Sequence, residues 1–357
     1  MHSRSTLLFL LLWPFAAFAA KGDEEHKIRV VKEFKAGSGS DLAVLNKYGK
    51  IVIKVWDKPV VRAEIEIVGF GKNQEQARSI AEMVNIAGSE SGSSIRIETK
   101  YNPGGSRWFS FGRKDSRDYV NINYVVNIPR NIKAVALENQ FGDILARDLP
   151  FDTRISVNYG FFDIGNAEKL KVTMNYTDKA RIEQVHRLEL NANYSSLRCG
   201  STKELKVNSN NSSYTFGEAG NMRLNSNYDE YRLTAVNDLS LSGNYSNLRA
   251  ETLKKNAVFN VNYTDLNIRR VDAAFSSITA HLRYSDLKLG MADRSAFRIT
   301  ANLHHGSLTT GDFEWKNVTN IRKNNNLSFS AITSNGTDAS GLIKIDGAYC
   351  DVKLAGE

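Results

Sequence analysis

Cysteine is scarce in this sequence, since its 357 residues include only Cys199 and Cys350. The chain also lacks a CxxC pair, a glycine-rich phosphate loop and a nucleophile motif, so no short motif indicates redox, nucleotide or hydrolase chemistry. Long apolar runs are equally rare. One occurs within residues 1–20, and no second run of the ~20 apolar residues that a spanning helix needs follows it.

Residues 1–20 have the pattern of a secretory signal peptide. A basic start, MHSR, precedes the apolar stretch TLLFLLLWPFAAFA, and Ala17-Phe18-Ala19 is a small-x-small cleavage site. We therefore expect an exported protein, in the periplasm, on the outer-membrane surface or secreted. No cysteine lies near the cleavage point, so a lipid anchor is not indicated. The remaining basic residues are spread along the chain, which favours a solvated surface over nucleic-acid binding.

The phrase Asn-Tyr-Ser/Thr recurs at a nearly constant interval. Residues four and six positions before the tyrosine, and three and five after it, are mostly apolar. That period of two predicts a strand on each side of a corner, each with one buried face. Successive members of the tyrosine column are 17–21 residues apart from Phe141 to His305, and the column comprises Phe141, Tyr159, Tyr176, Tyr194, Asn211, Tyr228, Tyr245, Tyr263, Tyr284, His305 and, further on, Tyr349.

So short a unit cannot bury its own apolar face, whereas stacked units share one core. Over residues 132–357 we predict an all-β fold, a parallel β-helix or β-solenoid with about 17–21 residues per coil. Stacked asparagine amides form hydrogen-bonded ladders in cross-β structures, and asparagine tolerates the left-handed backbone of sharp corners. The residue before the column therefore predicts a corner ladder of Asn158, Asn175, Asn193, Asn210, Asn227, Asn244 and Asn262.

The two cysteines fall at different places in this register. Cys199 lies on the inward column of its coil, and Cys350 follows the last corner. With the coil between His305 and Tyr349 left unplaced, we expect about eight coil steps, or roughly 40 Å, between the cysteines. A disulfide needs Cα atoms within ~7 Å, so we expect two free thiols, with that of Cys350 the easier to reach.

Residues 21–131 combine one coil-like phrase with an insertion. Residues 41–56, DLAVLNKYGKIVIKVW, fit the coil template around Tyr48. Apolar residues at helical spacing predict a helix at about 73–87, with Gly88 as a stop, and alternation predicts strands at 94–101 and 118–129. We expect this helix-bearing part to act as a cap on the open end of the stack, because solenoids need covered ends to stay soluble.

Several phrases of the chain resemble one bacterial family. NKYGKIVIKVW, a Gly-Phe-Gly turn before a short helix, NYVVNIP and repeated Asn-Tyr-Gly-Asp-like corners are similar to the putative-adhesin domains, also described as adhesin-like or auto-transporter-head-like domains of unknown function. The resemblance covers most of the chain after the leader. It implies an exported β-helix and an adhesin-like role, and it brings no catalytic residues.

The segment between the two predicted strands of the insertion holds the strongest binding motif. Aromatic side chains stack on sugars or insert at membrane surfaces, while arginine and lysine attract anions. The alternative is that these aromatics pack back on the solenoid. The candidate binding residues are Arg107, Trp108, Phe109, Phe111, Arg113 and Lys114.

Two other sets of residues are weaker candidates. Asp265 and Asp286 follow adjacent corners, and such a pair could hold Ca²⁺, although aspartate is also an ordinary corner residue. His281, His304 and His305 are close in sequence but do not share a column, so we interpret them as structural. We therefore expect no catalytic residues, no metal site and no cofactor.

Together these features predict a non-catalytic scaffold or binding protein of the cell envelope, adhesin-like, whose partner is a cell-surface glycan or another envelope component. Two alternatives stay open. A carbohydrate-active enzyme, either a polysaccharide lyase or a hydrolase, could use the same fold. An envelope factor could instead bind a protein at the C-terminal edge of the solenoid, since the chain ends three residues after Leu354 and leaves little to cover that edge.

Overall fold

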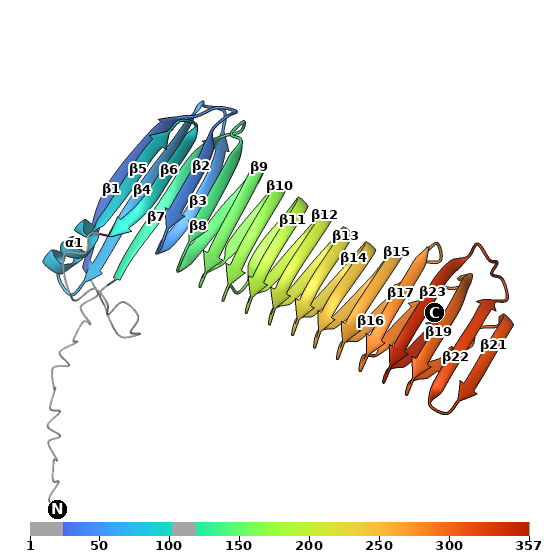
Figure 1. Ribbon diagram of the computed structural model, residues 1–357. Helices are drawn as coiled ribbons and strands as arrows, with labels where there is room; N and C mark the ends of the chain where they lie inside the picture. Colours follow the sequence, from blue (N-terminus) through green and yellow to red (C-terminus); the bar gives the residue numbers. More distant parts are fainter. Residues whose placement is uncertain (1–23, 102–118, 357) are drawn as a thin grey trace, which may run out of the picture.

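The computed structural model describes residues 24–101 and 119–356. Within these ranges the chain is all-β apart from one helix, and 24 strands form a long, open, solenoid-like sheet (Figure 1). The predicted leader and the aromatic and basic segment at 102–118 lie outside the described residues. The stack is elongated, with the N-terminal strands at one end and β21 and β22 at the other (Figure 1).

Seven long strands make the regular middle of the stack. Each pairs in parallel with the next, and apolar residues of the same column meet, as Leu188 meets Leu205 and Leu205 meets Met222. Alternate side chains point into a continuous core. The strands are β9 (Gly142–Asn158), β10 (Phe162–Asn175), β11 (Ala180–Asn193), β12 (Ser196–Asn210), β13 (Ser213–Asn227), β14 (Glu230–Asn244) and β15 (Asn247–Asn262).

The corner between consecutive coils is fixed by its backbone. The amide of each column residue donates to the carbonyl of the residue before the column in the next coil, as Tyr159 does to Asn175 at 3.2 Å. The column residues themselves adopt the left-handed conformation, with φ between 48° and 75°. The prediction that asparagine supplies this conformation is therefore wrong, because the sharp reversal falls one residue later. The coil of Tyr176 has one more residue after the corner than the next coil, since Ala180, four residues after Tyr176, pairs with Leu197, three residues after Tyr194. A second left-handed residue, Lys179, accommodates it.

The residue after the column turns inward and explains the Ser/Thr of the repeated phrase. Its side-chain oxygen accepts a hydrogen bond from the backbone amide of the equivalent residue in the preceding coil, at 2.8–3.2 Å. The serine and threonine hydroxyls also donate to the carbonyl two residues earlier, as Ser195 does to Asn193 at 2.8 Å. We call this set the buried oxygen column: Thr177, Ser195, Ser212, Asp229, Ser246, Thr264 and Ser285.

The C-terminal coils do not follow sequence order. β23 lies between β17 and β19 and pairs in parallel with both (Figure 1). β24 likewise pairs in parallel with β18 and β20. β22 is antiparallel to β19, and β21 is antiparallel to β22 at the end of the sheet. The strands are β16 (Asp265–Val271), β17 (Ser277–Arg283), β18 (Leu287–Met291), β19 (Phe297–His304), β20 (Ser307–Thr309), β21 (Trp315–Lys323), β22 (Asn326–Thr333), β23 (Gly341–Ala348) and β24 (Asp351–Gly356).

This order corrects two predictions. The last strand of the chain is paired on both sides, so the terminal edge consists of β21 and the short β20 rather than the strand that contains Leu354. Cys199 and Cys350 are separated by six coil steps, about 29 Å, rather than eight. Both thiols are free, but Cys350 is as buried as Cys199, because it occupies the inward position after Tyr349.

The N-terminal strands begin the stack. β2 and β3 pair in parallel with β8 and β9, with Ile51 beside Ile144, so residues 41–56 form a coil in the predicted register. The remaining strands extend the two sides, β5 and β6 beyond β2, and β7, β4 and β1 beyond β3. The strands are β1 (Glu24–Lys35), β2 (Asp41–Asn46), β3 (Gly49–Trp56), β4 (Val60–Gly71), β5 (Val84–Ser91), β6 (Ser94–Tyr101), β7 (Tyr119–Pro129) and β8 (Ala134–Asn139).

The helix of the insertion is shorter than predicted. α1 (Gln74–Glu82) begins after the N-cap Asn73, whose side chain accepts from the Gln76 amide, and the chain enters β5 at Val84. The apolar residues from Val84 to Gly88 therefore belong to a strand, which is the error in the predicted range of 73–87. α1 packs on β4, where Gly69 leaves no space for a Cβ beneath the Ala77 carbonyl.

We expect Ser195→Ala to lower the free energy of unfolding by about 1–3 kcal/mol, because it leaves the buried Thr177 amide without an acceptor. Ser242→Ala, an exposed serine of β14, is the matched control and should change it by less than about 0.5 kcal/mol. Urea unfolding measures both. Equal effects would contradict a structural role for the buried oxygen column.

Candidate functional site

A row of stacked rings runs along the outside of the corners. Neighbouring ring centroids are 4.8–5.5 Å apart, and most ring planes are within a few degrees of parallel. We call this row the aromatic ladder, and in stacking order it comprises Tyr48, Phe141, Tyr159, Tyr176, Tyr194, then Tyr228, Tyr245, Tyr263, Tyr284, Tyr349 and His305.

The rings of the ladder point to solvent, a direction that the sequence did not decide. Those of Phe141 and the tyrosines from Tyr159 onward are 40–57% exposed, which is unusual for so many aromatic side chains in one row. Because the faces of neighbouring rings cover one another, the ladder presents ring edges and phenolic hydroxyls at every coil. Such a row can make repeated hydrogen bonds and edge contacts to a partner that lies along it.

Asparagine amides flank the ladder. Asn175 donates to Asn158 and Asn193 donates to Asn175, each at 2.9 Å. On the other side of Asn210, Asn244 donates to Asn227 at 3.0 Å and Asn262 donates to Asn244 at 2.9 Å. Among the described side chains, no amide hydrogen bond joins Asn210 to Asn193 or to Asn227. A second row, Asn191, Asn208 and Asn225, is bonded in the same way on the neighbouring outward column.

The ladder is interrupted once, at Asn211. Its amide nitrogen donates to Asn210 Oδ1 at 3.0 Å, and its backbone is left-handed like that of the aromatic members. Both the ring stack and the amide row therefore stop at the same coil.

A buried polar cluster lies beside this interruption. Asp229 takes the place of serine or threonine in the buried oxygen column and accepts from the Ser212 amide at 2.8 Å and from Ser226 Oγ at 2.7 Å. The buried rings of Tyr214 and Tyr231 stack at 5.0 Å, and the Tyr231 hydroxyl donates to Asp229. Burial raises the pKa of the Asp229 carboxyl above its ordinary value.

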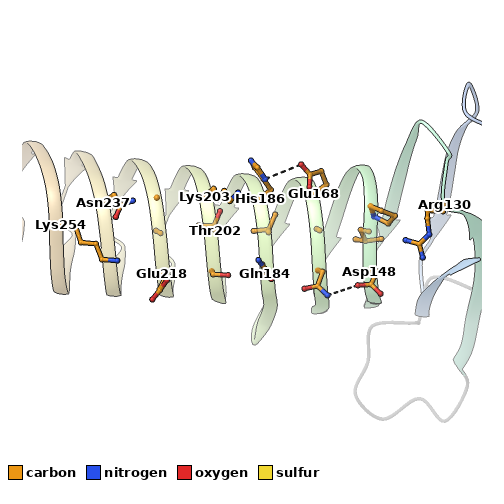
Figure 2. A pocket seen from close by; sticks show the side chains of 18 residues that line it. Arg130, Asp148, Glu168, Gln184, His186, Thr202, Lys203, Glu218, Asn237 and Lys254 are labelled. Atoms are coloured by element: carbon orange, nitrogen blue, oxygen red, sulfur yellow. Dashed lines mark hydrogen bonds and ion pairs between the residues drawn. The ribbon is translucent and has the colours of Figure 1, made fainter.

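A groove on the ladder-bearing coils lies at the opposite bend of the strands (Figure 2). It has a volume of about 670 Å³ and an outer rim of mixed charge, with Arg130, Lys203 and Lys254 among its cations. Two of its three acids have polar neighbours, because Asn166 donates to Asp148 at 2.9 Å and His186 lies 3.6 Å from Glu168, while Glu218 is the third (Figure 2). Pairs of this kind hold adjacent coils in register.

The weaker candidates from the sequence do not converge on a site. Asp286 accepts from the amide of Asp351, which the C-terminal strand order places in the next coil. His281 lies 3.8 Å from Asp346, His304 pairs with Asn326, and His305 stacks on Tyr349. Within residues 24–101 and 119–356, no group of three histidine, cysteine, aspartate or glutamate residues is arranged to hold a metal ion.

The predicted loop site is not part of the described structure. Its six residues, Arg107, Trp108, Phe109, Phe111, Arg113 and Lys114, lie outside the described residues and remain a prediction. In the described part of the chain, no helix is long and apolar enough to cross a membrane.

No family model and no curated protein matches the chain. Solved structures that resemble it include a "putative adhesin" from Parabacteroides merdae, 11% identical over 91% of this chain and 95% of that one, with a TM-score of 0.35. Another is a "putative cell adhesion protein" from Clostridium sporogenes, 8% identical over 93% and 100%, with a TM-score of 0.22.

A third resembling structure is a "putative lipid binding protein" from Parabacteroides distasonis, 8% identical over 91% of this chain and 96% of that one, with a TM-score of 0.31. The predicted resemblance to bacterial proteins that carry the adhesin name is confirmed. TM-scores this low carry no argument about the site or its ligand.

Asp229 makes stability depend on pH. Because its folded-state pKa is raised, the stability that it contributes is fully present below its unfolded pKa, near 3.8, and is lost as pH rises through the folded value. We therefore expect the free energy of unfolding of the native protein, relative to Asp229→Ser, to fall from pH 4 toward neutrality. Urea unfolding across that range measures the difference, and a constant difference would contradict the prediction.

Proposed function

We propose that this protein is a non-catalytic, exported binding protein of the cell envelope that presents the aromatic ladder to a repetitive partner such as a surface glycan. The observation that carries the proposal is an exposed row of aromatic residues at corners where the backbone is left-handed. In this reading residues 1–20 are the removed leader, residues 21–131 a cap-bearing part, and residues 132–357 a repetitive parallel β-helix.

The identity of the corner residue supports a role for the ring itself. A left-handed conformation costs an ordinary residue about 1–2 kcal/mol, whereas glycine adopts it freely and asparagine with less strain. Asn211 occupies the same backbone conformation as Tyr194 and Tyr228, so the corner does not require an aromatic residue. Stacking returns about 0.5–1.5 kcal/mol per pair, which is comparable with the backbone cost rather than well above it.

The regular spacing of the ladder favours a repetitive ligand. Each tyrosine-bearing coil offers the same exposed hydroxyl and ring edge, with an asparagine amide beside it in the central coils, so a polymer or an ordered surface can engage many equivalent weak contacts at once. Linked weak contacts of this kind raise the overall affinity without any single strong site. A compact ligand would use only one or two of them.

The enzyme alternative has less support. General acid–base catalysis needs carboxyl groups that converge on a substrate. In the groove of Figure 2, Asp148 and Glu168 each lie against a side chain of the neighbouring coil. These contacts explain Asp148 and Glu168 as parts of the stack, and the third acid of the groove, Glu218, does not by itself form an acid–base pair, so we place the function on the ladder rather than in this groove.

A protein partner at the terminal edge is the second candidate, and β21 favours it. Among the described strands this one pairs only with β22, and nearly all of it is exposed, including Val318 at 52% and Ile321 at 59%. An exposed edge strand offers unpaired backbone groups for strand addition by another chain. Lys316, Arg322 and Lys323 on the same strand would favour an acidic segment.

The ladder is tested with Tyr159→Asn combined with Tyr176→Asn, because asparagine already serves this position at 211. We expect at least tenfold weaker binding to purified envelope polysaccharide, measured by co-sedimentation and on a glycan array. The melting temperature should change little, since relief of the left-handed strain offsets part of the lost stacking.

The matched control is Lys206→Asn with Arg223→Asn, two exposed outward residues of β12 and β13 that lie off the ladder. This control should bind like the native protein. Equal binding by the ladder variant and the native protein would overturn the proposal, and a loss confined to the control variant would indicate general charge attraction instead.

A further inference from the structure

The interruption of the ladder at Asn211 has the shape of a binding site. We propose that the gap between the rings of Tyr194 and Tyr228 binds one planar aromatic ring, which takes the place of the missing member of the ladder. This inference deepens the proposed binding role of the ladder by naming a ligand class for one position. Its test is independent of the envelope partner.

The width of the gap follows from its neighbours. Tyr176 and Tyr194 stack at 5.2 Å with planes 2° apart, and Tyr228 and Tyr245 stack at 4.9 Å with planes 3° apart. Tyr194 and Tyr228 are two coil steps apart, or about 10 Å. Since one coil step brings two flat rings into stacking contact, two steps leave space for one further flat ring in contact with both faces.

The side chain of Asn211 leaves most of this space open. An amide is smaller than a phenol ring, and here it is exposed and turned toward Asn210, the preceding residue of its own chain. Tyr194 and Tyr228 are exposed by 54% and 57%, which is close to the 54% of Tyr159, a residue with a ring stacked on each side.

The other free ends of the ladder are covered. At the N-terminal end, Lys47 Nζ lies 5.5 Å from the centre of the Tyr48 ring, and Tyr101 meets that ring edge-on at 6.1 Å. At the other end, the turn that contains Asn325 follows His305, with Asn325 Nδ2 3.2 Å from His305 Nε2 and the His305 amide donating to the Asn325 carbonyl. Within the described residues, the gap at Asn211 is therefore the place where two ring faces of the ladder are opposed without a ring between them.

Polar groups flank the gap. Asn193 uses its amide nitrogen to bond Asn175, so its Oδ1 stays available as an acceptor. Asn227 uses Oδ1 to accept from Asn244, so its Nδ2 stays available as a donor. A ring that bears a hydroxyl or amide group matches these two groups, whereas an unsubstituted ring matches only the stacking faces.

The base of the gap is firmly held. Asp229 accepts from the Ser212 amide directly after Asn211 and from Ser226 Oγ in the next coil. Beneath it the stacked rings of Tyr214 and Tyr231 fill the core. A ligand would therefore enter a site whose two walls are already positioned, which lowers the entropic cost of binding.

The thickness of the gap favours a flat ring over a sugar. A pyranose ring is a puckered chair with axial hydrogens on both faces, so it needs more separation between two walls than an aromatic ring does. The ladder repeats at the spacing of flat rings in contact, and its walls are fixed to the coil repeat. We therefore commit to a planar aromatic ligand and treat sugar binding as an outcome of the test.

The probe is p-cresol, the tyrosine side chain as a free molecule, with binding measured by equilibrium dialysis against the full chain after export. We expect about one site on the native protein. Asn211→Tyr fills the gap and should weaken p-cresol binding at least tenfold while raising the melting temperature. Tyr263→Asn opens an equivalent gap between Tyr245 and Tyr284, each of which keeps a ring on its other side, and should add a second site.

The matched ligand control is 4-methylcyclohexanol, which has the same groups on a puckered ring and should bind at least tenfold more weakly than p-cresol. Unchanged p-cresol binding to Asn211→Tyr, or equal binding of the two ligands, would overturn the inference. Preferential binding of a methyl glycoside would replace it with a sugar site. These outcomes are separate from the envelope assay, since the gap can fail while Tyr159→Asn with Tyr176→Asn still loses polysaccharide binding, and the reverse can also occur.

Discussion

One hydrogen bond organises the whole molecule, that from the backbone amide of each corner residue to the carbonyl that precedes the corner of the next coil. The bond requires the corner residue to be left-handed, as Tyr194 is when it donates to Asn210. The same turn sends the following side chain inward, where Ser195 accepts from the Thr177 amide. It sends the corner side chain outward, where it meets its counterparts. The core, the buried oxygen column and the aromatic ladder all follow from this geometry.

Much of this fold could be predicted, because in a repetitive chain the sequence period shows which distant residues are neighbours. In a stack, residues of one column are neighbours, so the sequence period gives the register directly, and Leu188 and Leu205 are indeed paired. The exposure of the tyrosines could not be predicted. The alternation of strand residues stops at the corner, and only the backbone angle there decides which way Tyr194 and Ser195 turn. Asparagine tolerates such angles in general, so the sequence favours it for the left-handed position, whereas the structure places that conformation one residue later.

The order of the C-terminal strands could not be predicted from the sequence, for a related reason. The column pattern says which residues are equivalent but not which coils are adjacent. Tyr349 fits between Tyr284 and His305 as well as it would fit after His305, and ring distances of 4.8 and 4.9 Å show that it stacks on both. The hairpin of β21 and β22, which separates β20 from β23 in the chain, is what allows the later coil to insert. The paired position of β24 also moves the free edge to β21, which changes where a protein partner would attach.

The candidate site depends on a balance between backbone strain and ring stacking. The left-handed backbone at a tyrosine destabilises the fold by about 1–2 kcal/mol, and stacking on its two neighbours stabilises the fold by a similar amount. The cost of each tyrosine corner is therefore offset only if the neighbouring rings are present. A single substitution is therefore felt on both sides, and Asn211 separates the ladder into two independent runs. Asparagine at position 211 adopts the left-handed backbone with less strain than tyrosine, but it has no ring to stack. Tyr194 and Tyr228 therefore each keep one ring face without a stacking partner. An aromatic ligand in that gap would restore both contacts without occupying the left-handed backbone. The physical reason to expect binding there is that the ligand gains the stacking and bears none of the strain.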